Sequence, residues 1–133
     1  TATLHDLAKQ EFSKLRKVIR QAGPTASNAS IHRIRIKTKR ARYAAELAES
    51  TVGKSATRFI DKTCVAQDIL GIHQDAIQAE AYIRAFLKRS TSMRAAFVAG
   101  RMAERQRRRR EKAKEKIKRL LKSLLKRGEK AWE

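Results

Sequence analysis

The sequence predicts an all-α domain, on the evidence of its composition and its apolar spacing. Only five glycines and one proline occur among the 133 residues, and Ala, Leu, Lys, Arg, Glu and Gln, which favour helices, are common. Apolar residues recur at spacings of three and four along most of the chain, as on the buried face of an amphipathic helix. A chain of this length forms one domain, so we expect a single helical bundle over residues 1–133.

The first two expected helices are separated by a clear break. Residues 4–22 carry an apolar stripe at helical spacing, made of Leu4, Leu7, Ala8, Phe12, Leu15, Val18, Ile19 and Ala22. The segment GPTASNAS, residues 23–30, follows it. Glycine and proline stop a helix, and Asn or Ser can cap the next one. A second helix is therefore expected from residue 31 to residue 49.

Three further helices are expected in the rest of the chain. A turn at residues 52–53 precedes a third helix that ends at Gly71, because glycine suits a C-terminal cap. A fourth helix runs from residue 72 to residue 88. After RSTS, residues 89–92, a long basic helix over residues 93–130 carries a seam close to a heptad repeat. The expected architecture is an antiparallel bundle of four helices plus this long basic C-terminal helix.

The strongly positive charge of the chain restricts its partners. Lys and Arg number 33 against 13 Asp and Glu, a formal net charge of +20. Residues 101–133 hold fifteen cations and five acids and the first hundred hold eighteen and eight, so each part carries +10. Nucleic acid, anionic membrane and phosphate polymers are the natural counter-charges. Aromatic residues make up only 5% of the chain, which counts against base stacking on single strands.

Several kinds of site are not expected. Cys64 is the only cysteine, so the chain has no internal disulfide and no multi-cysteine metal site. The three histidines fall on separate expected helices, and we expect no metal, no cofactor and no catalysis. No apolar run approaches the roughly 18 residues of a membrane span, and no signal peptide is recognisable, so we expect a cytoplasmic protein. Because the sequence begins at Thr1, we expect a processed product or a segment of a longer protein.

The candidate site lies on the second expected helix, where residues 31–42 contain six Lys or Arg and one His. Winding this helix at about 100° per residue gives two apolar arcs. The first arc contains Ile31, Ile34, Thr38, Ala41, Ala45 and Ala48. The second arc contains Ile36, Tyr43 and Leu47. Between them lies a cationic strip, made of His32, Arg35, Lys39 and Arg42 with Glu46. The remaining cations point to roughly the opposite side, and these are Arg33, Lys37 and Arg40.

A strip between two packed flanks would lie in a groove, where cations need an anion or a carboxylate beside them. Glu46 can neutralise one cation and Asp75 another, which leaves the group unbalanced and favours an anion site. The alternative is a solvated face with snorkelling side chains. Tyr43 and His73 are further supporting residues. His73 and Asp75 also have structural alternatives. His73 could be a satisfied surface or interface histidine, and Asp75 could occupy a favourable position at the start of a helix.

At these residues the sequence resembles the CHAD family, the conserved histidine α-helical domain. The matching pattern lies in IHRIRIKTKRARYAAE, residues 31–46, and AQDILGIHQDA, residues 66–76, is similar to the family's second signature. GRMAERQRRRR, residues 100–110, and Trp132 resemble its C-terminal stretch. The resemblance implies a fold of two helical bundles around a basic channel, of which this chain would be the second, C-terminal bundle.

The resemblance also implies a ligand, inorganic polyphosphate. His32, Arg35, Lys39 and Arg42 would line the channel, and Arg33, Lys37 and Arg40 would extend it or form outer contacts. A second copy of the chain, as a homodimer, or an upstream half-domain would supply the other wall, unless the wall is absent. The protein would be cytoplasmic and associated with polyphosphate granules.

Three other readings stay open. A nucleic-acid-binding protein could use the same strip and the arginine run Arg107–Arg110, although no short helix-turn-helix signal is present. An enzyme, either a metal-dependent phosphohydrolase or a histidine phosphotransfer module, could use His32 or His73. The basic C-terminal helix could lie on anionic membrane, although its seam serves equally as a bundle or dimer contact.

Overall fold

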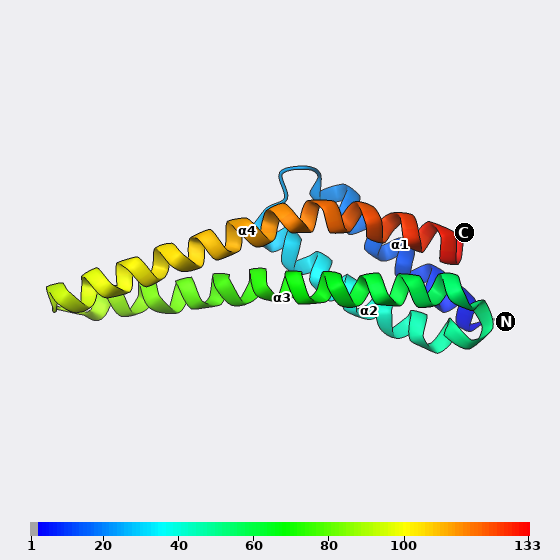
Figure 1. Cartoon of the computed structure of the whole chain (residues 1–133), viewed down its shortest axis with the longest axis horizontal. Coiled ribbons are helices and arrows are strands. Elements are labelled where there is room, and N and C mark those ends of the chain that lie inside the picture. Colours follow the sequence, from blue (N-terminus) through cyan, green and yellow to red (C-terminus); the bar gives the residue numbers. More distant parts are fainter. Residues whose placement is uncertain (1–2) are drawn as a thin grey trace.

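The computed structural model describes residues 3–133, which form four helices joined by short connections (Figure 1). The helices are α1 (Leu4–Ala22), α2 (Asn28–Val52), α3 (Lys54–Arg89) and α4 (Met93–Trp132). α2 packs against α1 and α3, and α3 packs along α4. No strand occurs in this part of the chain. The all-α prediction is confirmed, as is a long C-terminal helix.

The predicted helix boundary at Gly71 is wrong, because α3 continues through this residue to Arg89. The expected third and fourth helices are one, so the bundle has four helices with α4 included. A glycine inside a helix costs only about 1 kcal/mol relative to alanine. The buried stripe continues across it, from Leu70 to His73 and Ala76. Packing of that stripe outweighs the local cost, as tertiary contacts commonly do.

α3 and α4 extend beyond the other two helices as a two-helix hairpin (Figure 1). The turn between them lies at one end of the molecule, and the N- and C-termini lie together at the other end. The molecule therefore has a four-helix part near its termini and a projection that contains only α3 and α4. We call residues 82–102, which include the turn, the hairpin arm.

A cluster of aromatic rings holds the terminal end of the four-helix part together. The ring of Phe59 on α3 packs edge to face against Phe12 on α1, with centroids 5.6 Å apart, and against Trp132 on α4, with centroids 5.9 Å apart. All three side chains are fully buried. Edge-to-face aromatic pairs add stability beyond their buried area, so this cluster locks three of the four helices.

The N-terminus of α1 and the C-terminus of α4 are fixed by polar contacts. Thr3 and Asp6 form a capping box, in which each side chain accepts a hydrogen bond from the backbone amide of the other residue. Arg16 on α1 donates to both carboxylate oxygens of Glu133, at 2.8 and 2.6 Å. This bidentate pair lowers the pKa of the Glu133 carboxyl.

Gly128→Ala should destabilise the fold, because a Cβ at this position would overlap the ring of Phe12. Overpacking of a core costs about 1–3 kcal/mol, so the Tm in a thermal melt should fall by several degrees. Gly100→Ala is the matched control, since a Cβ there would meet open space in the same helix and should leave the Tm unchanged or slightly higher. Equal melting temperatures for the two variants would contradict the packing described.

Candidate anion-binding site

The buried face of α2 decides where its cations point. The members of the first apolar arc are all buried, as predicted, and these are Ile31, Ile34, Thr38, Ala41, Ala45 and Ala48. The Thr38 hydroxyl donates to the backbone carbonyl of Ile34 at 2.8 Å, so its burial leaves no unpaired donor. Alanine at several of these positions lets neighbouring helices approach closely. This face therefore fixes the rotation of α2 about its own axis.

The prediction that the second arc is also packed is wrong. Ile36, Tyr43 and Leu47 are 39%, 52% and 56% exposed. The reason is that α1 and α3 are the helices that pack against α2, and both lie on the side of the first arc. The second arc is thus an exposed apolar flank, and the cationic strip has one packed flank and one open flank.

A hollow lies on this exposed flank, and not between two packed flanks as the sequence predicted. The hollow, of about 480 Å³, is lined by Arg35, Ile36, Lys39, Arg40 and Tyr43 of α2 and by Gln67 of α3. The Lys39 ammonium lies 5.9 Å from the centroid of the Tyr43 ring, within cation–π range. Three cations line the hollow and no carboxylate does. We call this hollow the α2 groove.

Arg40 was predicted to point away from the strip, and the structure corrects that assignment. At about 100° per residue, the exposed flank lies between the strip on one side and Arg33, Lys37 and Arg40 on the other. Because no helix of the described residues covers this flank, Arg40 shares the hollow with Arg35 and Lys39. Arg33 and Lys37 belong to the same second row of cations but do not line the α2 groove.

Arg42 is held by partners at the edge of the α2 groove. Its Nε donates to Glu46 Oε1 at 2.8 Å and its Nη1 donates to Gln67 Oε1 at 3.0 Å. The hydrogen bond to Glu46 raises the pKa of Arg42. Glu46 therefore pairs with a strip cation, as expected. Arg42 bridges α2 to α3 and turns Gln67 toward the groove.

His32 lies one turn before Arg35, outside the set of residues that line the α2 groove. Its side chain is half-buried, and Nδ1 is buried without a hydrogen-bond partner among the described residues. The residues predicted to bind the anion therefore divide into three groups: Arg35, Lys39 and Arg40 in the groove, Arg42 at its edge, and the remaining three of the set outside it, which are His32, Arg33 and Lys37.

The two supporting residues predicted on α3 lie elsewhere. His73 is fully buried, and neither ring nitrogen has a partner among residues 3–133. Burial lowers the pKa of His73, and the charges of Arg110 and Lys114 on α4 lower it further. Asp75 is exposed and forms no ion pair with a strip cation in the described part of the chain. It also lies far inside α3, so the proposed helix-start role for Asp75 is wrong.

Two residues that line the α2 groove were not predicted as site residues, Ile36 and Gln67, and of these Gln67 is polar. Its side-chain oxygen accepts the hydrogen bond from Arg42, which joins α2 to α3. Its spacing gave no sign that it would face the cations, because the angle between two helices is not encoded in the periodicity of either one.

Two further observations concern residues 3–133. No cluster of three or more His, Cys, Asp or Glu side chains is placed to hold a metal ion there. None of the four helices combines the length and the apolar character needed to cross a membrane.

His73→Leu should raise the folding stability of the protein. It should also make that stability fall less when the pH is lowered into the mildly acidic range. The lowered pKa means that the unfolded chain takes up this proton more readily than the folded chain. Stability from neutral His73 is therefore complete above its ordinary pKa of 6.5 and declines as the pH falls below it. Leucine also removes two unpartnered buried nitrogens, which cost about 1–3 kcal/mol. Thermal melts of both proteins between pH 5 and 8 test this, and parallel pH profiles would contradict it.

Comparison with known proteins identifies the family. A family model described as the CHAD domain matches residues 1–84, more than half of the 133. The match includes α1, α2, every residue that lines the α2 groove and most of α3. The searches of curated proteins and of solved structures each found no match. The CHAD domain is associated with polyphosphate binding. This chain belongs to the CHAD family.

Proposed function

We propose that this protein binds inorganic polyphosphate through the α2 groove and does not cleave it. The observation that carries the proposal is the lining of the groove, which contains Arg35, Lys39 and Arg40 but no carboxylate. Cations crowded in a hollow repel one another, and an anion relieves the repulsion. The family match over residues 1–84 makes a phosphate polymer the first candidate for that anion.

The spacing of the cations suits a linear polyanion. The rise of about 1.5 Å per residue places Arg35 and Arg42 roughly 10 Å apart along the axis of α2, so successive phosphates can lie along it. Arginine offers its guanidinium as a planar fork to phosphate oxygens, whereas lysine acts as a compact charge. The Tyr43 hydroxyl and the Gln67 amide, which also line the groove, are neutral donors that can add hydrogen bonds.

The exposed flank gives the site a place for a second wall. Ile36, Tyr43 and Leu47 form a row at spacings of seven and four residues, and rows of cations run along both sides of it. A second copy of this chain or an upstream half-domain could cover the row and enclose the polyphosphate. The protein would then act in the cytoplasm, at polyphosphate granules.

Binding without hydrolysis fits the residues of the α2 groove. Magnesium-dependent phosphoryl chemistry needs oxygen ligands, commonly carboxylates, to hold the metal. The carboxylate of Glu46 is linked to the groove through Arg42 and Gln67, and Arg42 already engages it. Release of phosphate from polyphosphate by the purified protein with added magnesium would contradict this part of the proposal.

The arginine run is the alternative basis for nucleic-acid binding, and the structure places it on α4, outside the α2 groove. Much of the run is occupied by acids of the same chain. Arg107 and Arg108 pair with Glu104, and Arg110 pairs with Glu80 and Glu111. The Arg107 hydrogen bond lowers the pKa of Glu104 to about 2. The run therefore offers less free positive charge than its sequence indicates.

Arg35→Gln with Lys39→Gln should weaken polyphosphate binding by at least about tenfold and reduce its salt dependence. Each cation removed from contact lowers the slope of log affinity against log salt by about 0.7 to 0.9. The matched control is Lys9→Gln with Lys54→Gln, two exposed cations outside the groove. Both double variants lower the formal net charge from +20 to +18, so a titration at several salt concentrations separates local contact from net charge.

Two results would contradict the proposal, one from this titration and one from a competition experiment. Equal losses in the two double variants would show that net charge alone binds the polymer. Displacement of long-chain polyphosphate by duplex DNA of equal phosphate content would favour the nucleic-acid function instead.

A further inference from the structure

The hairpin arm exposes a group of large apolar side chains, which a surface in contact with water alone does not need. Six of them lie within residues 82–102, and these are Tyr82, Phe86, Met93, Phe97, Val98 and Met102. Tyr82 is 76% exposed and Met93 is 90% exposed. Only α3 and α4 are present in this part of the molecule (Figure 1), so no third helix of the described chain covers them. An apolar patch of this kind typically marks an interaction site.

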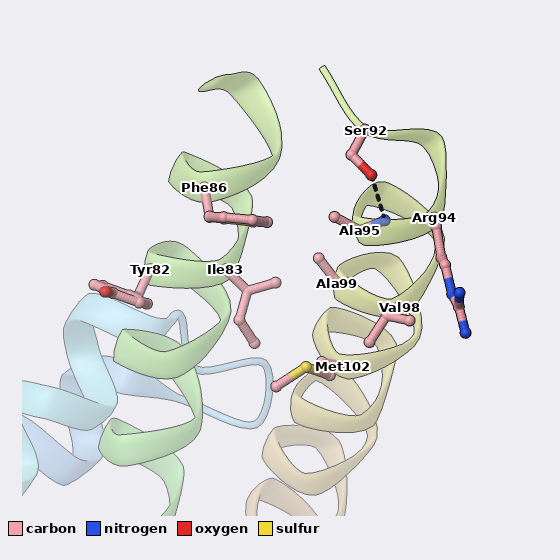
Figure 2. A pocket seen from close by; sticks show the side chains of 9 residues that line it. All are labelled: Tyr82, Ile83, Phe86, Ser92, Arg94, Ala95, Val98, Ala99 and Met102. Carbon is pink, nitrogen blue, oxygen red and sulfur yellow. Dashed lines mark hydrogen bonds between the residues drawn. The ribbon is translucent and has the colours of Figure 1, made fainter. Parts of the chain in front are cut away.

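Part of this patch forms a groove between the two helices of the arm (Figure 2). The groove has a volume of about 560 Å³. Ile83 and Phe86 of α3 extend toward α4 and form one wall, with Tyr82 at the outer edge of the groove, and Val98 and Met102, one turn apart on α4, form the other wall. On the α4 side, alanine at positions 95 and 99 faces the larger side chains of α3, and these small side chains leave the space that the groove occupies. We call this hollow the arm groove.

The spacing of the walls suits a helix as the occupant. Side chains three residues apart on α3 and four residues apart on α4 form ridges that run along the arm, and such ridges pack against the side-chain rows of another helix. A groove of this kind is filled by apolar residues at positions i, i+3, i+4 and i+7 of an amphipathic helix. With a third helix in place, the arm would resemble the body of the protein, where each helix is covered by others.

The charge of the arm selects the kind of helix. Residues 82–102 contain five cations and no acidic residue. The cations are Arg84, Lys88, Arg89, Arg94 and Arg101. Arg94 lies beside the arm groove and extends away from α3 (Figure 2). A second copy of this arm would bring five more cations against these five, which opposes self-association. A helix with acidic residues beside its apolar stripe would have complementary charge.

We propose that the arm groove binds an amphipathic helix of a partner protein whose flanks are acidic. The apolar stripe of the partner fills the space between Phe86 and Met102, and its carboxylates face the surrounding arginines and lysines. A lipid surface would fit less well, because it would meet the outward residues Met93 and Phe97 and leave a concave groove unfilled. This proposal concerns a surface separate from the α2 groove and does not depend on polyphosphate binding.

A synthetic peptide can test the proposal. The probe is a fluorescently labelled peptide of about 18 residues, with leucines at helical i, i+3, i+4, i+7 spacing and glutamates beside them. A peptide of the same composition with scrambled leucines is the reference. Fluorescence anisotropy should show that the full chain binds the amphipathic peptide at least about tenfold more tightly than the scrambled one.

Matched variants locate the binding surface. Val98→Gln with Met102→Gln should weaken binding of the peptide by at least about tenfold. Phe97→Gln is the control, because Phe97 is 66% exposed on the same helix but does not line the arm groove, and it should leave the affinity unchanged. Glutamine keeps the helix and adds no charge. All variants should bind polyphosphate as the parent does, which separates this test from that of the α2 groove.

Several outcomes would overturn the proposal. One is equal affinity for the two peptides, and another is an equal loss in the groove variant and the Phe97 control. A dimer in light scattering that Val98→Gln with Met102→Gln dissociates would make a second copy the occupant. Binding to phosphatidylserine vesicles that Phe97→Gln abolishes, without peptide binding, would assign the arm to a membrane.

Discussion

The packing of one face of α2 determines the rest of the candidate site. Ile31, Ile34 and the alanines that follow them are buried against α1 and α3, so α2 cannot rotate without exposing apolar surface, at about 25 cal/mol per Å². The same face fixes the direction of every cation on the helix. Because α1 and α3 cover the buried side of α2, its cations lie on the remaining surface. They form two rows, one on each side of Ile36, Tyr43 and Leu47.

The chain has two exposed surfaces of different character, and each combines positive charge with apolar side chains. In the α2 groove the cations themselves line the hollow, which suits a small or linear anion. In the arm groove apolar side chains line the hollow and the cations surround it, which suits a folded partner with acidic flanks. Glu104 and Glu133 are two acids that pair with cations outside both surfaces, Glu104 with Arg107 and Glu133 with Arg16.

The sequence predicted well the features that are determined within a single helix. The stripe spacing correctly predicted α1, α2 and the buried arc of α2. It predicted less well what depends on several helices together. The predicted helix end at Gly71 is wrong because the burial of Leu70 and His73, on both sides of it in α3, outweighs the local preference of glycine. Arg40 and Gln67 lie in the groove because α1 and α3 leave that side of α2 uncovered. The apolar periodicity of α2 does not show which side this will be.

Binding of polyphosphate in the α2 groove can be tested most directly by an NMR titration of isotopically labelled protein with short-chain polyphosphate. A salt concentration of about 0.1 M screens long-range electrostatic interactions. The account predicts that the largest shifts occur in the Arg35 and Arg40 side-chain signals and in the backbone amides of residues 32–43, with Gln67 following and the hairpin arm unaffected. Shifts that centre on Arg107–Arg110, or that spread evenly over the cations of all four helices, would contradict it.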